Sequence, residues 1–471
     1  MKNILKNFTY QMIFQLTKIL LPIITIPIVS KALGPQGIGV YNYTFANIQY
    51  FVLFAGLGIS LFGTREIASA ANYHERNVTF SNLFIMKIIT SIISLIIFLI
   101  FLSISNHKFF YFLQSLSILA VLFDVSWYYM GIENFKKTSL VQTLVQIISF
   151  FLIVVLIKNY DDLTLYIVIQ SGSLLVSQLI IFLTTKNYFN FKFVEKKRVI
   201  RYFKNSFHYF IPSVAVSIYS ILNKTILGVF DGPTSVGFFT NSMQLNTVFI
   251  TLISTMDTVL LPKMSKMFSD SKDQEMVKML KTVIGIQTSI SIPIMFGICA
   301  IQEQLIPWFF GNEFLTIRNY VPFLSIIIVI SPIGISIARQ FLLPRGEINK
   351  YNKSVFLGAI ISVVLNCILI PFLHVYGAII ATIISEMFVT LSRYIDFKRT
   401  SDVNLLGKNT VFATISGIIM FYIITNFTKK LALTSSMSTT IIQVGIGVLV
   451  YAITFVTLEI LNKKIDSLKK K

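Results

Sequence analysis

The amino-acid sequence predicts an all-α membrane protein with 14 transmembrane helices. Apolar runs of about 20 residues recur along the whole chain, and each is long enough to cross a bilayer as a helix. Hydrophobic residues make up 55% of the 471 residues, and charged residues only 13%, whereas soluble domains carry about 25% charged residues. Lys and Arg gather in the short segments between the apolar runs. Together these features exclude an ordinary soluble protein.

Each predicted span is one apolar run. The fourteen runs cover residues 8–30, 38–63, 79–105, 111–131, 139–157, 163–185, 207–230, 237–262, 283–303, 320–343, 355–373, 377–395, 410–427 and 439–462. The first run follows Lys2 and Lys6 but does not end in a small-residue cleavage site, so we interpret it as a span and not as a signal peptide. The fourth and eighth runs are the most polar, and a break in one of them would be unsurprising.

The distribution of positive charge sets the orientation. With a cytoplasmic N-terminus, 30 of the 40 Lys and Arg residues fall on the inside when Arg393, at the inner end of the twelfth run, is counted there; six fall in outside loops, and four others lie within spans. An excess of Lys and Arg marks cytoplasmic loops, so we expect a multi-pass protein of the cytoplasmic (inner) membrane with both termini in the cytoplasm. The net charge of +20 is spread over short loops that face anionic lipid. A nucleic-acid partner is therefore not expected.

Two short motifs recur and indicate an internal duplication. Gly-Pro-Gln-Gly-Ile-Gly at residues 34–39 is matched by Gly-Pro-Thr-Ser-Val-Gly at residues 232–237, and Glu-Asn-Phe-Lys at 133–136 by Glu-Ile-Asn-Lys at 347–350. The two copies of each motif follow spans that are six apart in the chain. Because six is an even number, both halves enter the membrane in the same direction, so they are expected to be parallel repeats related by a pseudo-two-fold axis along the membrane normal. The expected parts are an N-terminal lobe (1–185), a basic interfacial linker (186–206), a C-terminal lobe (207–395), and two extra spans with a basic tail (396–471).

Polar and charged side chains inside the predicted spans are the candidate binding residues. Gln11, Gln15 and Lys18 share one stripe of the first span. Lys224 lies on the seventh span, which the duplication relates to the first, and Arg339 lies near the inner end of the tenth. A charge at this depth needs a partner or a water-filled cavity. In a cavity these cations would attract an anionic, phosphate-bearing head group. Alternatively, Lys18 pairs with a carboxylate within the bundle, or its amine reaches the membrane surface.

Asp124 is the best acidic candidate for a proton or cation site. As the partner of a buried lysine it would instead be purely structural, and the sequence leaves both roles open. Aromatic side chains at Tyr41, Tyr43 and 127–129 would either stack on sugar rings or form an interfacial belt.

Enzymatic chemistry is not expected. The sequence has no nucleophile elbow, no paired catalytic carboxylates and no spaced His, Cys and carboxylate cluster for a metal. The glycines at 34, 37 and 39 follow a helix and lack a Lys-Ser/Thr, so they do not form a phosphate-binding loop. Glycine with proline instead predicts a tight extracellular turn after the first span, and the repeated motif predicts the same turn after the seventh. Neither a metal nor another cofactor is predicted.

Several stretches resemble the Wzx-type polysaccharide flippases, which handle O-antigen, capsule or other repeat units. They belong to the multidrug/oligosaccharidyl-lipid/polysaccharide exporter superfamily. The similar stretches lie in one order along nearly the whole chain, at residues 27–41, 56–68, 124–136, 261–265 and 377–386. Lys31 stands where the family usually has arginine, and an aspartate expected near Lys224 is absent. No family role is therefore transferred to these two positions.

The resemblance implies two six-helix lobes and alternating access to a central cavity. The implied substrate is an undecaprenyl-pyrophosphate-linked oligosaccharide, moved from the inner to the outer leaflet and driven by a coupling cation or the membrane potential. Glycosyltransferases and a polymerase would be its neighbours. Arg65 and Glu66 at the cytoplasmic mouth, with Asp124, are candidates for gating or coupling. Alternatives are a cation-coupled multidrug exporter of the same superfamily and, in another class, a membrane polysaccharide polymerase or ligase. The short outside loops disfavour the enzyme.

Overall fold

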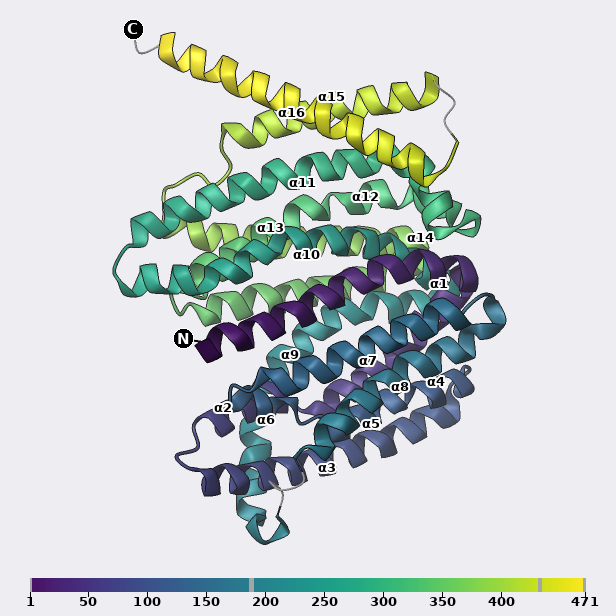
Figure 1. The fold of residues 1–471 in the computed structure, drawn as a ribbon, viewed down its shortest axis with the longest axis vertical. Helices are drawn as coiled ribbons and strands as arrows, with labels where there is room; N and C mark the ends of the chain where they lie inside the picture. The colour runs from purple at the N-terminus through teal and green to yellow at the C-terminus, as the bar shows by residue number, and fades with distance from the viewer. Residues whose placement is uncertain (1, 186–189, 431–433, 469–471) are drawn as a thin grey trace. The chain divides into compact units, whose positions relative to one another are not determined.

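The computed structural model describes residues 2–185, 190–430 and 434–468, and every regular element in these ranges is a helix (Figure 1). Eleven of the described helices are long and apolar enough to cross a membrane. The expectation of an all-α, multi-pass membrane protein is therefore confirmed, while the number of fourteen spans stays a prediction. The chain divides into two compact units, Met1–Gly237 (the N-terminal unit) and Phe238–Lys471 (the C-terminal unit).

The N-terminal unit is built from helices that pack side by side in Figure 1. Its helices are α1 (Lys2–Gly56), α2 (Ile59–Ala68), α3 (Tyr73–Ile104), α4 (Lys108–Gln114), α5 (Leu116–Phe123), α6 (Ser126–Gly131), α7 (Phe135–Leu156), α8 (Leu163–Leu183) and α9 (Lys196–Phe230), with short 3₁₀ turns at Tyr160–Asp162 and Phe191–Phe193. The fourth predicted span is interrupted: α4, α5 and α6 are separate, with breaks at Ser115 and at Asp124–Val125. The basic residues from Lys196 onward, expected in a linker, lie on the same helix as the seventh predicted span.

Both copies of the Gly-Pro motif form the same turn. Gly34 has φ 62° inside α1, and Gly232 has φ 84° just before α10 (Pro233–Ser269). Positive φ is accessible to glycine without steric penalty, and proline suits the first turn of a helix. At each position the chain therefore leaves one helix and starts another. Both prolines and both following glycines belong to the N-terminal unit.

The two turns contact each other reciprocally through their glycines. A β-carbon built on Gly39 would lie 1.7 Å from the carbonyl oxygen of Pro233, and one on Gly237 would lie 2.0 Å from that of Pro35. Each glycine is 198 residues from its counterpart, as is each proline. Such a two-fold relation is what two copies of one motif produce when they pack against each other.

Aromatic side chains fill the core of the N-terminal unit. Trp127, Tyr128 and Tyr129 are at most 2% exposed and pack among Phe62 and Phe80. These three rings therefore neither form an interfacial belt nor face a sugar. Tyr41 packs edge-on against Tyr166, with 4.9 Å between ring centroids.

The C-terminal unit is also helical throughout its described residues. It contains α10, α11 (Asp273–Phe310), α12 (Val321–Ser325), α13 (Ile327–Ile337), α14 (Ile348–Lys398), α15 (Lys408–Lys430) and α16 (Met437–Leu468), a 3₁₀ turn at Asn312–Asn319 and the π-helix η5 (Ala338–Leu342). Its core centres on Met264, Met276, Phe341 and Phe397. Helix α14 is bent at His374, where φ is 50°.

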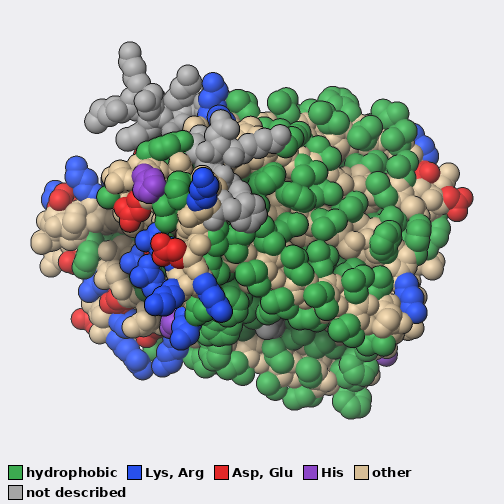
Figure 2. Space-filling view, turned by 90° about the horizontal axis from the view of Figure 1, so that it is seen from below, with side chains coloured by type: hydrophobic (Ala, Val, Ile, Leu, Met, Phe, Trp, Pro, Cys, Tyr) green, Lys and Arg blue, Asp and Glu red, His purple; other side chains and the backbone are tan. Residues whose placement is uncertain are grey.

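Exposed apolar side chains are numerous, as a lipid-facing surface requires. On the face shown in Figure 2, hydrophobic side chains cover a broad area, and Lys and Arg gather apart from it. In α3, for example, Ile93, Ile96, Leu99 and Ile100 are all at least 40% exposed. In water this surface would be strongly unfavourable; in a bilayer it is solvated.

Candidate functional site

A chain of hydrogen bonds joins α9 to α1 in the N-terminal unit. The Lys224 Nζ donates to the Asn42 side-chain oxygen at 3.3 Å. One residue along, the Thr225 hydroxyl donates to the Asn47 side-chain oxygen at 3.0 Å, and the Asn47 amide donates to the Tyr111 hydroxyl at 2.6 Å. Among the described residues, no carboxylate forms an ion pair with the half-buried Lys224. Its positive charge is thus held by a neutral amide and stays available to an anion.

The polar stripe of the first predicted span lies on α1. Lys18 is exposed, and its amine lies 5.6 Å from the centre of the Phe14 ring. No ion pair of Lys18 with a carboxylate occurs in the part of the chain that the structure describes, which disfavours the bundle-pairing alternative. Gln11 and Gln15 lie on the same helix, but their side chains fall outside the described residues.

Lys87 and Asp124 form an ion pair across α3 and the break between α5 and α6. The Lys87 Nζ lies 3.5 Å from the Asp124 Oδ2, and it also donates to the Asp124 backbone carbonyl. Asp124 Oδ1 accepts the backbone N–H of Ser126 at 2.9 Å, which fixes the start of α6. The Lys87 side chain is 2% exposed. Of the two roles left open for Asp124, this geometry favours the structural one.

Arg65 and Glu66 lie on α2, the short helix after the break at Leu57 and Gly58. Arg65 is exposed, and its guanidinium donates to the hydroxyl of Tyr209 on α9. This bond links α2 to α9 at the surface, as a gating contact would. Glu66 is partly buried.

Arg339 lies in the C-terminal unit, on the π-helix η5. Its guanidinium donates to the hydroxyl of Thr258 on α10 at 2.5 Å. Thr258 follows Asp257, which is fully buried and hydrogen-bonded to Gln287, Ser336 and Gln340. The sequence does not reveal this cluster, because its members come from α10, α11, α13 and η5.

A second buried cation was missed altogether. Arg393 is 7% exposed, donates to the Ser354 hydroxyl and the Gly334 carbonyl at 3.0 and 3.1 Å, and stacks over the Tyr351 ring. Charge counting assigned it to the cytoplasmic side because it lies at the end of the twelfth predicted span. A signal was present, since Arg393 lies within the twelfth predicted span, and a charge inside a span needs a partner or a water-filled cavity.

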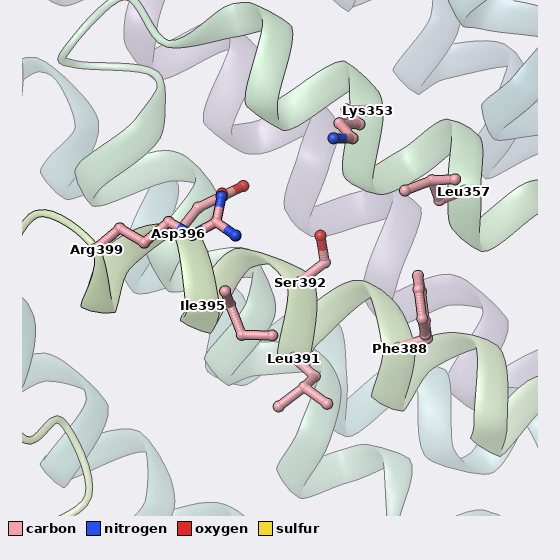
Figure 3. Close-up of a pocket in the computed structure, with 8 residues that line it drawn as sticks. All are labelled: Lys353, Leu357, Phe388, Leu391, Ser392, Ile395, Asp396 and Arg399. Atoms are coloured by element: carbon pink, nitrogen blue, oxygen red, sulfur yellow. The ribbon is translucent and has the colours of Figure 1, made fainter.

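A pocket of about 210 Å³, open on one side, lies between the parts of α14 before and after the bend at His374, its two arms (Figure 3). Lys353 and Leu357 come from the arm before His374, and the remaining lining residues from the arm after it: Phe388, Leu391, Ser392, Ile395, Asp396 and Arg399. Arg399 lies 3.9 Å from Asp396, so one of the two cations is already partly neutralised. Typical small-molecule sites measure about 300–1,000 Å³, so this pocket is too small for an oligosaccharide.

A sequence model of the family described as "Polysaccharide biosynthesis protein" matches residues 4–268, more than half of the chain. The chain belongs to this family. The matched region contains the hydrogen bonds from Lys224 and Thr225 to α1, the Lys87–Asp124 pair and both Gly-Pro turns.

Two relatives of this chain are transport proteins by name. It is 23% identical to the "Putative O-antigen transporter" of Escherichia coli (strain K12) over 398 residues, which cover 82% of this chain and 94% of that protein. It is 24% identical to the "Probable low-salt glycan biosynthesis flippase Agl15" of Haloferax volcanii over 259 residues, covering 53% and 54% of the two chains. Its fold is similar to that of the lipid II flippase MurJ in an inward closed conformation, with a TM-score of 0.73, 16% identity, and coverage of 96% and 99%.

Proposed function

We propose that this protein moves undecaprenyl-pyrophosphate-linked oligosaccharides from the inner to the outer leaflet of the cytoplasmic membrane by alternating access. Its membership of the polysaccharide biosynthesis protein family supports this proposal, as do relatives named as an O-antigen transporter and a glycan flippase. The observation that carries it is the state of Lys224, a half-buried cation in the apolar segment Ile221–Phe230 of α9, with an amide partner and, among the described residues, no carboxylate.

In the proposed mechanism the cations hold the pyrophosphate while the lipid tail stays in the bilayer. The proposed cations are Lys224 and Lys18 of the N-terminal unit and Arg339 of the C-terminal unit, and Gln11 and Gln15, on the same helix as Lys18, are proposed to assist. Ammonium groups bind phosphate as point charges without fixed geometry, so they keep hold of a head group that has to move. Arg65 and Glu66 would take part in gating at the cytoplasmic side.

The proposed topology has fourteen spans with both termini in the cytoplasm. Eleven apolar helices meet the length and composition of a span. The bends at Gly34 and His374 divide α1 and α14 into two spans each, and α9, apolar over Ile221–Phe230, supplies one more. Topological labelling of cysteines placed in the loops tests this arrangement; a label from outside that reaches residues 263–272 would contradict it.

Lys224→Ala is expected to reduce export of the glycan roughly ten- to a hundredfold, because a hydrogen bond to a charged group contributes about 1.5–3 kcal/mol and about 1.4 kcal/mol corresponds to tenfold. Lys224→Arg should retain most of the export, since the positive charge stays. Surface glycan is measured in a deletion strain that expresses each variant at wild-type level. Lys158→Ala, at an exposed outside lysine, is the control. If both Lys18→Ala and Lys224→Ala exported normally, the proposed role of these cations would be wrong.

A further inference from the structure

Three side chains form a closed hydrogen-bonded ring inside the C-terminal unit. Asp257 comes from α10, Gln287 from α11 and Ser336 from the last turn of α13. The Ser336 Oγ lies 2.6 Å from the Asp257 Oδ1 and 2.7 Å from the Gln287 Oε1, and the Gln287 Nε2 lies 3.0 Å from the Asp257 Oδ2. All three residues are fully buried. From outside the ring, the Gln340 amide on the π-helix η5 donates to the Asp257 Oδ1.

The ring has three contacts, and each contact needs one hydrogen. The serine hydroxyl carries a single hydrogen, so it donates either to Asp257 or to Gln287 and not to both. The Gln287 amide supplies one further hydrogen, along its contact with Asp257. If Asp257 is ionised it supplies none, and two hydrogens serve three contacts. Two oxygen acceptors would then face each other at 2.6 or 2.7 Å without a hydrogen between them.

Reversing the Gln287 amide does not remove the shortage. The Nε2 would then donate to the Ser336 Oγ, and the Ser336 hydroxyl to the Asp257 Oδ1, but the Gln287 Oε1 would face the Asp257 Oδ2. That contact again lacks a hydrogen. A single serine hydrogen shared between two acceptors is also disfavoured, because both distances equal those of full O–H···O bonds, about 2.7 Å. A hydrogen on the carboxyl group completes the ring with either amide orientation.

We propose that Asp257, Gln287 and Ser336 form a proton-binding site within the C-terminal unit, with the proton on the Asp257 carboxyl group. An ionised carboxylate buried among neutral partners is strongly unfavourable. A charged group near Asp257 is Arg339 on η5, but its guanidinium donates to Thr258 instead of to the carboxylate. The direct O···O contacts leave no room for a metal ion between the ring oxygens, so the ligand is the proton itself.

This site implies that the proton is the coupling ion of the transport cycle, an inference that rests on the proposed function. When α10, α11 and α13 separate enough to admit water, the O–H bond of Asp257 breaks, its electron pair stays on the carboxylate, and the proton passes to water. Re-forming the ring takes a proton up again. The π-helix η5 brings Gln340 against the same carboxyl group; π-helical turns are frequent at functional sites.

Infrared difference spectroscopy of the purified full-length protein in lipid bilayers at neutral pH tests proton binding. The spectrum of wild type minus Asp257→Asn is expected to show the C=O stretch of a protonated carboxyl. The matched control is Asp124→Asn, because Asp124 is paired with Lys87; the corresponding spectrum should show carboxylate stretches. Carboxylate stretches in the Asp257 spectrum would overturn the proposal. This result does not depend on the transported substrate.

Two further measurements complete the test. Ser336→Ala removes the acceptor of the carboxyl proton in one Gln287 amide orientation and a donor to the same carboxyl group in the other. In both cases it should shift the protonated-carboxyl band, even if Asp257→Asn cannot be purified; a spectrum without such a shift would overturn the ring. In cells, collapse of the pH gradient with nigericin should reduce wild-type glycan export severalfold. Normal export under nigericin would overturn the coupling while leaving the proposed transport function intact. The proposed function itself is tested separately, by glycan export in the Lys18→Ala and Lys224→Ala variants.

Discussion

Gly39→Ala is expected to destabilise the N-terminal unit by about 3 kcal/mol, the upper end of the cost of overpacking. The added β-carbon would lie 1.7 Å from the Pro233 carbonyl oxygen. No rotamer change relieves this contact, because the backbone fixes the position of the β-carbon and the oxygen is itself a backbone atom. The start of α10 has to move away from α1. Gly237→Ala should have the same effect, because its β-carbon meets the Pro35 carbonyl oxygen at 2.0 Å.

The measurement is the thermal unfolding midpoint of the detergent-solubilised variants, together with surface glycan in the deletion strain. Gly172→Ala in α8 is the control: its β-carbon meets no atom within 4 Å, and alanine is the better helix former by about 1 kcal/mol. The control should therefore be as stable as wild type or more stable. A Gly39→Ala protein as stable as the control would contradict the reciprocal contact. Because both glycines act at one contact, the double variant should be much less than additive.

Composition and repetition were sufficient to predict the main features of the fold. The low content of charged residues predicted a multi-pass helical membrane protein, since a bilayer leaves few other solutions for the backbone. The repeated Gly-Pro motif predicted two equivalent turns, and both glycines have positive φ. The break in the fourth predicted span occurs at Ser115 and Asp124, polar residues in an otherwise apolar run.

The candidate site was less accessible to sequence reasoning. Lys18 and Lys224 were predicted to face a cavity from the first and seventh spans; they lie on α1 and α9, and the cavity stays a prediction. The partners of a buried polar group, however, depend on helix rotation and depth. Asp257, Gln287 and Ser336 are separated by 30 and 49 residues, and their spacing has no periodicity that would relate them. Arg393 was missed for the same reason: its burial results from packing against Tyr351 and Ser354.

Lys87→Met is expected to destabilise the protein by about 3 kcal/mol, because removing one partner of a buried ion pair leaves the other charge unpaired. Asp124 is 26% exposed, so the lower end of the range for buried pairs applies. Asp124→Asn should be at least as damaging, since Lys87 is almost fully buried and would keep its charge without a carboxylate. Thermal unfolding midpoints of both single variants provide the measurement.

The double variant Lys87→Met/Asp124→Asn separates a structural role from a role in coupling. With no charge left at the pair, most of the lost stability should return, and the asparagine oxygen would still accept the Ser126 backbone N–H that starts α6. If the pair is structural, export of the surface glycan recovers together with stability. A double variant that is stable but exports nothing would show instead that Asp124 takes part in coupling. The contrast with Asp257 is physical: a carboxylate beside a lysine is held ionised, whereas one surrounded by a serine and two glutamines is the group that keeps a proton.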